Sequence, residues 1–119
     1  MKPRNIWIQK EYLLEFRMLS TLENLIKLAR ERKLSPVDGS YTNKLLTNKA
    51  LSKAKVLEEV DELIEAIEED TNKIHEAADV FYHLLMYLDA NEVKIEEVMQ
   101  ELEKRKKWAM MIVISLQKF

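Results

Sequence analysis

The sequence predicts an all-α protein, a helical bundle of about four to five helices within a single domain over residues 1–119. Three observations support this fold class. The chain has one glycine and two prolines in 119 residues, so it offers little material for tight β-turns. Its apolar residues make up 47% of the total and recur over long segments with the 3.6-residue period of amphipathic helices. The length is also sufficient for one hydrophobic core.

Composition excludes several classes of function. Without cysteine the chain has no disulfide and no thiolate metal site. A net charge of −2 gives no general attraction to nucleic acid or to an anionic membrane. Residues 1–19 form an N-terminal extension whose Lys2 and Arg4 resemble the start of a signal peptide, but Gln9–Glu11 interrupts the apolar stretch that would follow. We therefore expect no export and a cytoplasmic location.

The first half of the chain predicts two helices separated by a loop. The first begins near Ser20, where Ser20–Glu23 reads as a capping box, and fades near Lys33. The loop over Leu34–Ser40 contains Gly39, where we expect an unusual φ angle. Ser40 is then expected to cap a short helix. The apolar contacts of that helix are Tyr41, Leu45 and Leu46.

Two longer helices follow, each with an apolar face. The first runs from about Leu51 to Asp70, and either Asp70 or Thr71 is expected to cap the second, which ends near Asp89. The acidic residues of the first lie beside and opposite its apolar face. The expected packing residues are Val56, Val60, Leu63, Ile64 and Ile67 in the first helix and Ala77, Phe81, Leu84, Leu85 and Leu88 in the second.

Asn91 is expected to take the left-handed conformation that ends a helix. The last helix ends in the basic run Lys104–Lys107, which suits the helix dipole. Residues 108–119 form an apolar tail of unclear role, a packing segment, a subunit contact or a disordered extension, and are too short to span a membrane. The apolar stripe of the last helix is Ile95, Val98, Met99 and Leu102.

The segment Lys55–Asp79 concentrates acidic residues on the two long helices. It holds 10 of the 21 acidic residues and 2 of the 19 basic ones, so it carries −8 while the rest of the chain carries +6. Residues three or four apart are neighbours on a helix, and like charges at that spacing destabilise it by about 0.2 to 0.5 kcal/mol per pair. A bound divalent cation would remove this repulsion.

The spacing identifies the candidate ligands. Glu59 and Glu62 are three residues apart on one helix, as are Glu76 and Asp79 on the next. All-oxygen ligands favour Mg²⁺, with Mn²⁺ as an alternative, over zinc. Mg²⁺ is commonly completed by substrate phosphates, so we expect metal-assisted attack on a phosphate chain. Glu58, one turn from Glu62, is the candidate for orienting water or for binding a second metal.

The same residues have a purely structural interpretation. A Glu-rich helix face is most often solvated surface. His83 shares a stripe with Glu76 and Asp79, but such a histidine more often lies at the edge of a core than in a metal site, and His75 is expected at the surface. Lys55 can simply pair with Glu59 at i,i+4. From spacing alone the chain is a helical bundle with a candidate metal site.

The order of motifs adds a resemblance. The chain contains Gly39-Ser40-Tyr41-Thr42 with Lys44-Leu45-Leu46, Lys55-Val56-Leu57-Glu58-Glu59 with Glu62, Glu76-Ala77-Ala78-Asp79 with Tyr82-His83-Leu84-Leu85, and Val98, Glu101-Leu102 and Arg105. In this order they resemble phosphoribosyl-ATP pyrophosphohydrolase of histidine biosynthesis, over about Leu22 to Lys107. The acidic pairs are shared with the wider MazG-like all-α nucleotide pyrophosphohydrolases. Leu57 stands where many bacterial members have glycine. In lacking that glycine, the chain resembles the variant found in fused histidine enzymes.

The resemblance implies hydrolysis of the α,β-phosphoanhydride of phosphoribosyl-ATP to phosphoribosyl-AMP and pyrophosphate with Mg²⁺. It implies that Glu59, Glu62, Glu76 and Asp79 bind the metal and that Glu58 assists as the catalytic residue. The expected substrate-binding residues are Ser40, Tyr41, Thr42 and Lys44, at the start of a helix that can hold phosphate, together with Lys55. Members of the family that the chain resembles are dimeric, so the resemblance also implies a homodimer.

Two alternatives stay open. A MazG-like house-cleaning enzyme acting on nucleoside triphosphates would use the same acidic helices, and a substrate panel separates the two. A non-enzymatic helical interaction module would show no Mg²⁺-dependent release of pyrophosphate.

Overall fold

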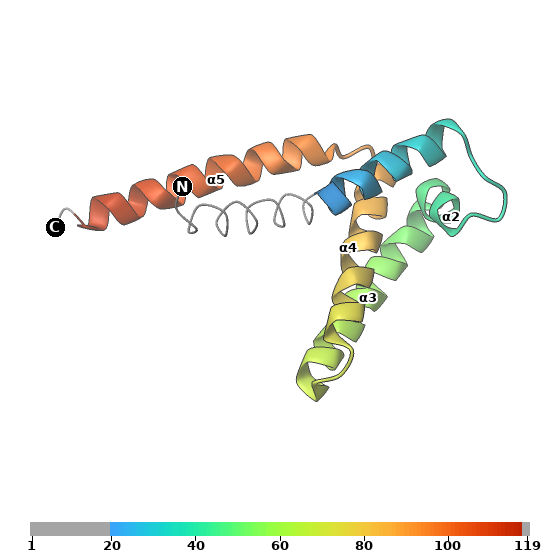
Figure 1. Cartoon of the computed structure of the whole chain (residues 1–119), viewed down its shortest axis with the longest axis horizontal. Coiled ribbons are helices and arrows are strands. Elements are labelled where there is room, and N and C mark those ends of the chain that lie inside the picture. Colours follow the sequence, from blue (N-terminus) through green and yellow to red (C-terminus); the bar gives the residue numbers. More distant parts are fainter. Residues whose placement is uncertain (1–19, 118–119) are drawn as a thin grey trace, which may run out of the picture. The chain divides into compact units, whose positions relative to one another are not determined.

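The computed structural model describes residues 20–117, and all regular structure in this range is helical (Figure 1). A helix over residues 20–34 precedes α2 (Tyr41–Thr47), α3 (Lys49–Glu69), α4 (Lys73–Ala90) and α5 (Ile95–Gln117). The predicted all-α class is confirmed. Of the helices described, none has the length and apolar character that crossing a membrane requires.

The chain divides into two compact units, one up to Lys44 and one from Leu45 onward. The single domain over residues 1–119 stays a prediction. The predicted extension over residues 1–19 lies outside the described residues.

The first unit has a helix and a loop closed by side-chain hydrogen bonds. Ser20 is already helical and the helix ends at residue 34, close to the predicted end. Gly39 has a φ of 77°, which confirms the expected unusual conformation. The Asn43 side chain accepts from the Val37 amide at 2.9 Å and donates to the Arg32 carbonyl at 2.8 Å. Asn43 therefore ties both sides of the loop to the first turn of α2.

The predicted cap of α2 is confirmed. The Ser40 hydroxyl accepts from the backbone amide of Asn43 at 3.3 Å, which satisfies one of the free amides at the helix start. Of the expected apolar contacts, Leu45 and Leu46 are buried, whereas Tyr41 is 42% exposed.

The ends of α3 and α4 are set by three polar residues. Asn48 caps α3 through its side chain, which accepts from the Leu51 amide at 3.0 Å. Asp70 ends α3 in the left-handed conformation, with φ of 57°. Asn72 occupies the cap position of α4 without a side-chain cap bond. The prediction that Asp70 or Thr71 caps α4 is wrong, because Asp70 takes the left-handed position that closes α3.

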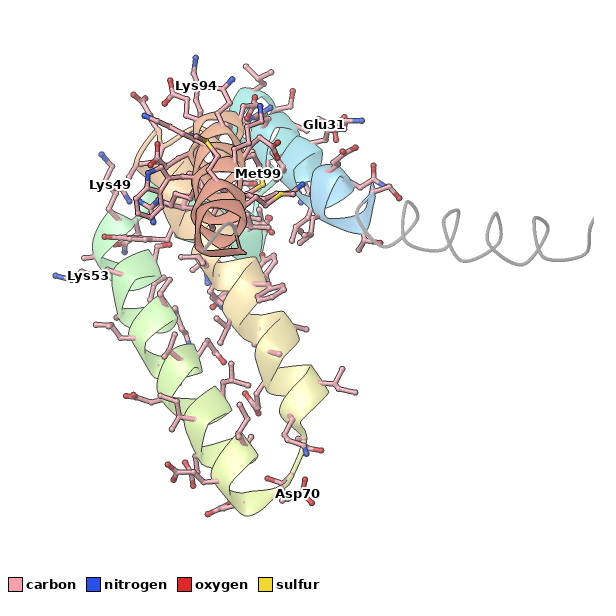
Figure 2. All side chains as sticks on the ribbon, turned by 90° about the vertical axis from the view of Figure 1, so that its left-hand side faces the viewer. Glu31, Lys49, Lys53, Asp70, Lys94 and Met99 are labelled. Carbon is pink, nitrogen blue, oxygen red and sulfur yellow. The ribbon has the colours of Figure 1, made fainter. Side chains whose placement is uncertain are left out.

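The second unit is built on the antiparallel hairpin of α3 and α4, joined near Asp70 (Figure 2). Glu59 and His83 each lie twelve residues from Thr71, and Ser52 and Ala90 each lie nineteen. In an antiparallel hairpin, residues equally distant from the turn lie at the same level. The buried residues of α3 recur every seven positions, at Ser52, Glu59 and Ala66. On α4, His83 and Ala90 lie at the levels of Glu59 and Ser52, and the buried Met86 lies between those two levels.

This register corrects the predicted packing faces. On α3 the half-buried Val56 and Leu63 flank the interface, but Val60, Ile64 and Ile67 are 36%, 49% and 57% exposed. On α4 the predicted Ala77, Leu85 and Leu88 are half-buried, whereas Phe81 and Leu84 are exposed. The face of α3 that carries Glu59 and Ala66, rather than the one that carries Ile64 and Ile67, therefore packs against α4. Periodicity locates an apolar face but does not show which surface covers it.

The connection to α5 also departs from expectation. Asn91 has a φ of −99°, and the left-handed residue is Glu92, with φ of 58°. The helix continues to Gln117, so the predicted end at Lys107 is wrong. Lysine and arginine are good helix formers, and no proline or glycine follows them to stop the helix. Ile95 and Val98 are half-buried, whereas Met99 and Leu102 are exposed.

Candidate metal centre

The hairpin brings the predicted acidic residues together. One carboxylate oxygen from each of Glu59, Glu62 and Glu76 lies within 4.8 Å of the others, and the same holds for ligand atoms of His75, Glu76 and Asp79. The two groups share Glu76. Helical spacing places each pair on one side of its helix, and the hairpin register places the two pairs opposite each other.

The donor atoms suit a divalent cation of the size of Mg²⁺. Opposite ligands of Mg²⁺ are about 4.2 Å apart, twice the metal–oxygen distance, so separations within 4.8 Å need only small side-chain rotations. Glu59 is 7% exposed. Among the described residues, its Oε2 atom and Oε2 of Glu76 are buried without a hydrogen-bond partner. Burying such atoms is costly unless they are compensated, and a cation between them would supply the compensation. The residues therefore fit the metal that the spacing predicts.

Two carboxyl groups of the cluster have raised pKa values. Burial raises the pKa of Glu59, and the charge and hydrogen bond of Glu62 raise it further. The pKa of Glu76 is raised in the same way, by desolvation first and then by Glu62, with Asp79 adding to both. A bound cation would offset the repulsion between these carboxylates and favour their ionised forms.

Two histidines border the carboxylates. The exposed His75 places its Nε2 atom 3.4 Å from Oδ2 of Asp79. His83 is 5% exposed, and its Nδ1 atom lies 2.7 Å from the Asp79 carbonyl oxygen. His83 is therefore fully inside the hairpin, deeper than the core edge where sequence reasoning placed it. The seven-residue spacing of Glu76 and His83 is the signal that could have shown this.

Glu58 lies at the exposed side of the cluster. Its Oε2 atom is 3.1 Å from Nζ of Lys55, so Lys55 pairs with Glu58 rather than with Glu59 as the structural alternative suggested. Glu58 does not belong to either ligand group. At the other side, Glu62 and Glu76 line a hollow of about 160 Å³ that leads toward the turn. The cluster can thus be reached from solvent.

Four of the predicted substrate-binding residues belong to the first unit. Ser40 is half-buried, Thr42 is buried, and Tyr41 and Lys44 are exposed. Only Lys55 lies in the same unit as the carboxylates. The role of these five residues in binding a substrate stays a prediction.

Fold and site together define an all-α protein with a candidate divalent-metal centre on a helical hairpin. The chain belongs to the phosphoribosyl-ATP pyrophosphohydrolase family, whose sequence model matches residues 22–106, a range that includes all four carboxylates. The resemblance drawn from the motifs is confirmed, and with it the assignment of the chain as a hydrolase.

Individual relatives support the same family assignment. The chain is 41% identical over 92 residues to a phosphoribosyl-ATP pyrophosphatase of Clostridium acetobutylicum, covering 74% of this chain and 80% of that protein. It is 42% identical over 90 residues to one of Cereibacter sphaeroides, covering 73% and 87%. A histidine biosynthesis bifunctional protein of Pyrococcus furiosus is 41% identical over 92 residues, covering 75% of this chain but only 43% of that protein. No solved structure matches the chain.

Proposed function

We propose that this protein hydrolyses phosphoribosyl-ATP to phosphoribosyl-AMP and pyrophosphate, the second step of histidine biosynthesis, with Mg²⁺ as its cofactor. Family membership supports the substrate. The observation that carries the metal dependence is the convergence of Glu59, Glu62 and Glu76, two of which have buried oxygens that lack partners among the described residues. The predicted cytoplasmic location is part of the same proposal.

Each residue of the site has a distinct task in this reaction. Glu59, Glu62, Glu76 and Asp79 would hold the metal. When bound, Mg²⁺ would neutralise charge on the phosphate chain and polarise the phosphoryl oxygens. Glu58 orients the attacking water and accepts its proton, while Lys55, 3.1 Å from Glu58, offsets the negative charge of the phosphates.

The proposed reaction replaces one phosphorus–oxygen bond with another. A bond forms between the water oxygen and the α-phosphorus. The α,β-anhydride bond breaks, and pyrophosphate leaves with the bonding electrons. A carboxylate on the solvent side of the cluster is suited to this proton transfer because it stays accessible to water, and the side chain of Glu58 is 51% exposed.

The test measures pyrophosphate release from phosphoribosyl-ATP with and without Mg²⁺. We expect Glu62→Gln and Asp79→Asn each to lower turnover by roughly 100-fold or more, because each removes a charged ligand. Glu68→Gln is the matched control, since Glu68 is an exposed glutamate on α3 outside both ligand groups. Turnover like the wild type in both site variants would overturn the assignment. Higher activity on a panel of nucleoside triphosphates would favour the house-cleaning alternative.

We also propose that the protein is a homodimer. The stripe Leu57, Val60, Ile64 and Ile67 follows one face of α3, and its members are 36% to 59% exposed. Phe81 on α4 is 56% exposed. Large apolar side chains exposed in a row are typical of a protein–protein contact, and a small chain gains core from a partner.

Light scattering after size-exclusion chromatography tests the dimer. We expect twice the chain mass of 14.1 kDa for the wild type and for the control Asp61→Lys, which changes an exposed charge outside the stripe. Ile64→Glu should give the mass of one chain, because it would bury a charge without a partner. A wild type that elutes with the mass of one chain would contradict the proposal.

A further inference from the structure

We propose that His83 is a positioning residue that orients the buried carboxylate of Glu59 for metal binding. The inference rests on the proposed metal dependence and assigns a role to a side chain that the proposed reaction does not otherwise use.

The register of the hairpin places Glu59 and His83 at the same level, each twelve residues from Thr71. Both are almost completely buried, at 7% and 5% exposed. Their level lies between the Ala66 level and that of Ser52 and Ala90, where small side chains let the helices approach closely. The two polar side chains therefore both lie inside the helix–helix interface rather than in solvent.

A hydrogen bond to the backbone of α4 sets the orientation of the His83 ring. A carbonyl oxygen only accepts hydrogen bonds, so Nδ1 of His83 donates to the Asp79 carbonyl across the 2.7 Å that separates them. This bond fixes the ring plane and leaves Nε2 as the atom that can serve Glu59. In the proposed role, Nε2 forms a hydrogen bond with the carboxyl group of Glu59.

The ring also relates the two helices of the site. Its Nδ1 bond goes to the backbone of Asp79, in the α4 segment that carries two of the predicted ligands, and the ring lies at the level of the predicted ligand Glu59 on α3.

Three substitutions separate positioning from packing. His83→Gln places an amide where Nε2 lies and can still reach Glu59. His83→Asn keeps the donor near the Asp79 carbonyl but is too short to reach Glu59. His83→Leu fills a similar volume with no polar atom, and an apolar side chain suits a buried site. A packing role predicts that binding follows stability, whereas a positioning role predicts that the leucine variant can be stable and still bind metal weakly.

The experiment measures Mn²⁺ affinity of the full chain by calorimetry, without substrate, beside thermal unfolding. We expect affinity to fall about 10- to 100-fold in the Leu and Asn variants, the usual loss for a group that supports a metal ligand, and less in the Gln variant. In a Glu59→Gln background, His83→Leu should cause no further loss. Mn²⁺ affinity within about threefold of the wild type in the leucine variant would overturn the proposal.

Three further outcomes are decisive. If the leucine variant does not fold, equal Mn²⁺ affinities of the Gln and Asn variants overturn the proposal, and tighter binding by Gln supports it. A wild type that binds Mn²⁺ but releases no pyrophosphate from phosphoribosyl-ATP refutes the proposed function and leaves the role of His83 standing. A wild type that binds no Mn²⁺ refutes the role of His83.

Discussion

Ser52 places a hydroxyl group inside the hairpin, at the same level as Ala90. The residue is fully buried, and its Oγ atom has no hydrogen-bond partner among the described residues. Removing a buried hydroxyl that lacks a partner relieves its desolvation cost, and alanine is also the better helix former. We expect Ser52→Ala to raise the free energy of unfolding by about 1 kcal/mol, measured by urea denaturation.

Ser52→Val is the matched variant for this prediction. Valine adds volume at a level where the facing residue is only alanine, and overpacking a tight interface costs about 1 to 3 kcal/mol. The alanine variant should therefore be more stable than the wild type and the valine variant less stable. A destabilised alanine variant would show that the hydroxyl group has a stabilising partner.

Residue spacing in the sequence identifies part of the candidate site. The metal ligands could be proposed from the sequence, because helical periodicity alone places Glu59 beside Glu62 and Glu76 beside Asp79. The role of His83 could not, because it depends on which face of α4 meets α3. That choice is made by the register of the hairpin, and register follows from the turn at Asp70 and Asn72, whose positive φ angles are not evident from composition.

At the scale of the elements, the turn between α4 and α5 stores strain at Glu92. Its φ of 58° is costly for a residue with a Cβ atom, by about 1 to 2 kcal/mol, and glycine adopts it freely. We expect Glu92→Gly to raise the free energy of unfolding by about 0.5 to 1 kcal/mol. Urea denaturation of the two proteins measures the difference.

Its neighbour provides the control. Asn91 has a φ of −99°, so glycine gains nothing there, and its side chain donates to the Tyr87 carbonyl at 2.8 Å. Asn91→Gly should therefore lower stability. If the two glycine variants change stability equally, strain at Glu92 is not the cause.

The elements also show how far the fold could be predicted. The helices and the loop at Gly39 were predictable because caps, glycine and periodicity are local signals. The exposed stripe at Ile64 and the buried Glu59 were not, because burial depends on contacts between helices. The left-handed conformation was predicted for Asn91 but falls on Glu92, since the backbone of the turn, rather than residue preference, decides between neighbours.

At the scale of the whole molecule, the raised pKa values of Glu59 and Glu76 make stability depend on pH. Both groups hold protons more tightly in the folded protein than at the ordinary value of 4.5. Below that value both states are protonated. As the pH rises above it, the unfolded chain loses these protons first, so the metal-free protein should lose stability until the folded-state pKa values are passed.

Urea denaturation in EDTA between pH 4.5 and 8 tests this dependence, with Glu59→Gln/Glu76→Gln as the control. Because the two amides do not titrate, the decline across this range should be smaller in the double variant, and an equal decline in both proteins would contradict the prediction. Mg²⁺ binds the deprotonated carboxylates, so it should reverse the decline in the wild type alone. Free Mg²⁺ at ten times the dissociation constant measured at pH 8 should raise the free energy of unfolding by about 1.4 kcal/mol at that pH. The same concentration should raise it by less at pH 5, because protons compete for the carboxylates. The repulsion that weakens the metal-free hairpin would then be the same feature that makes it select a divalent cation.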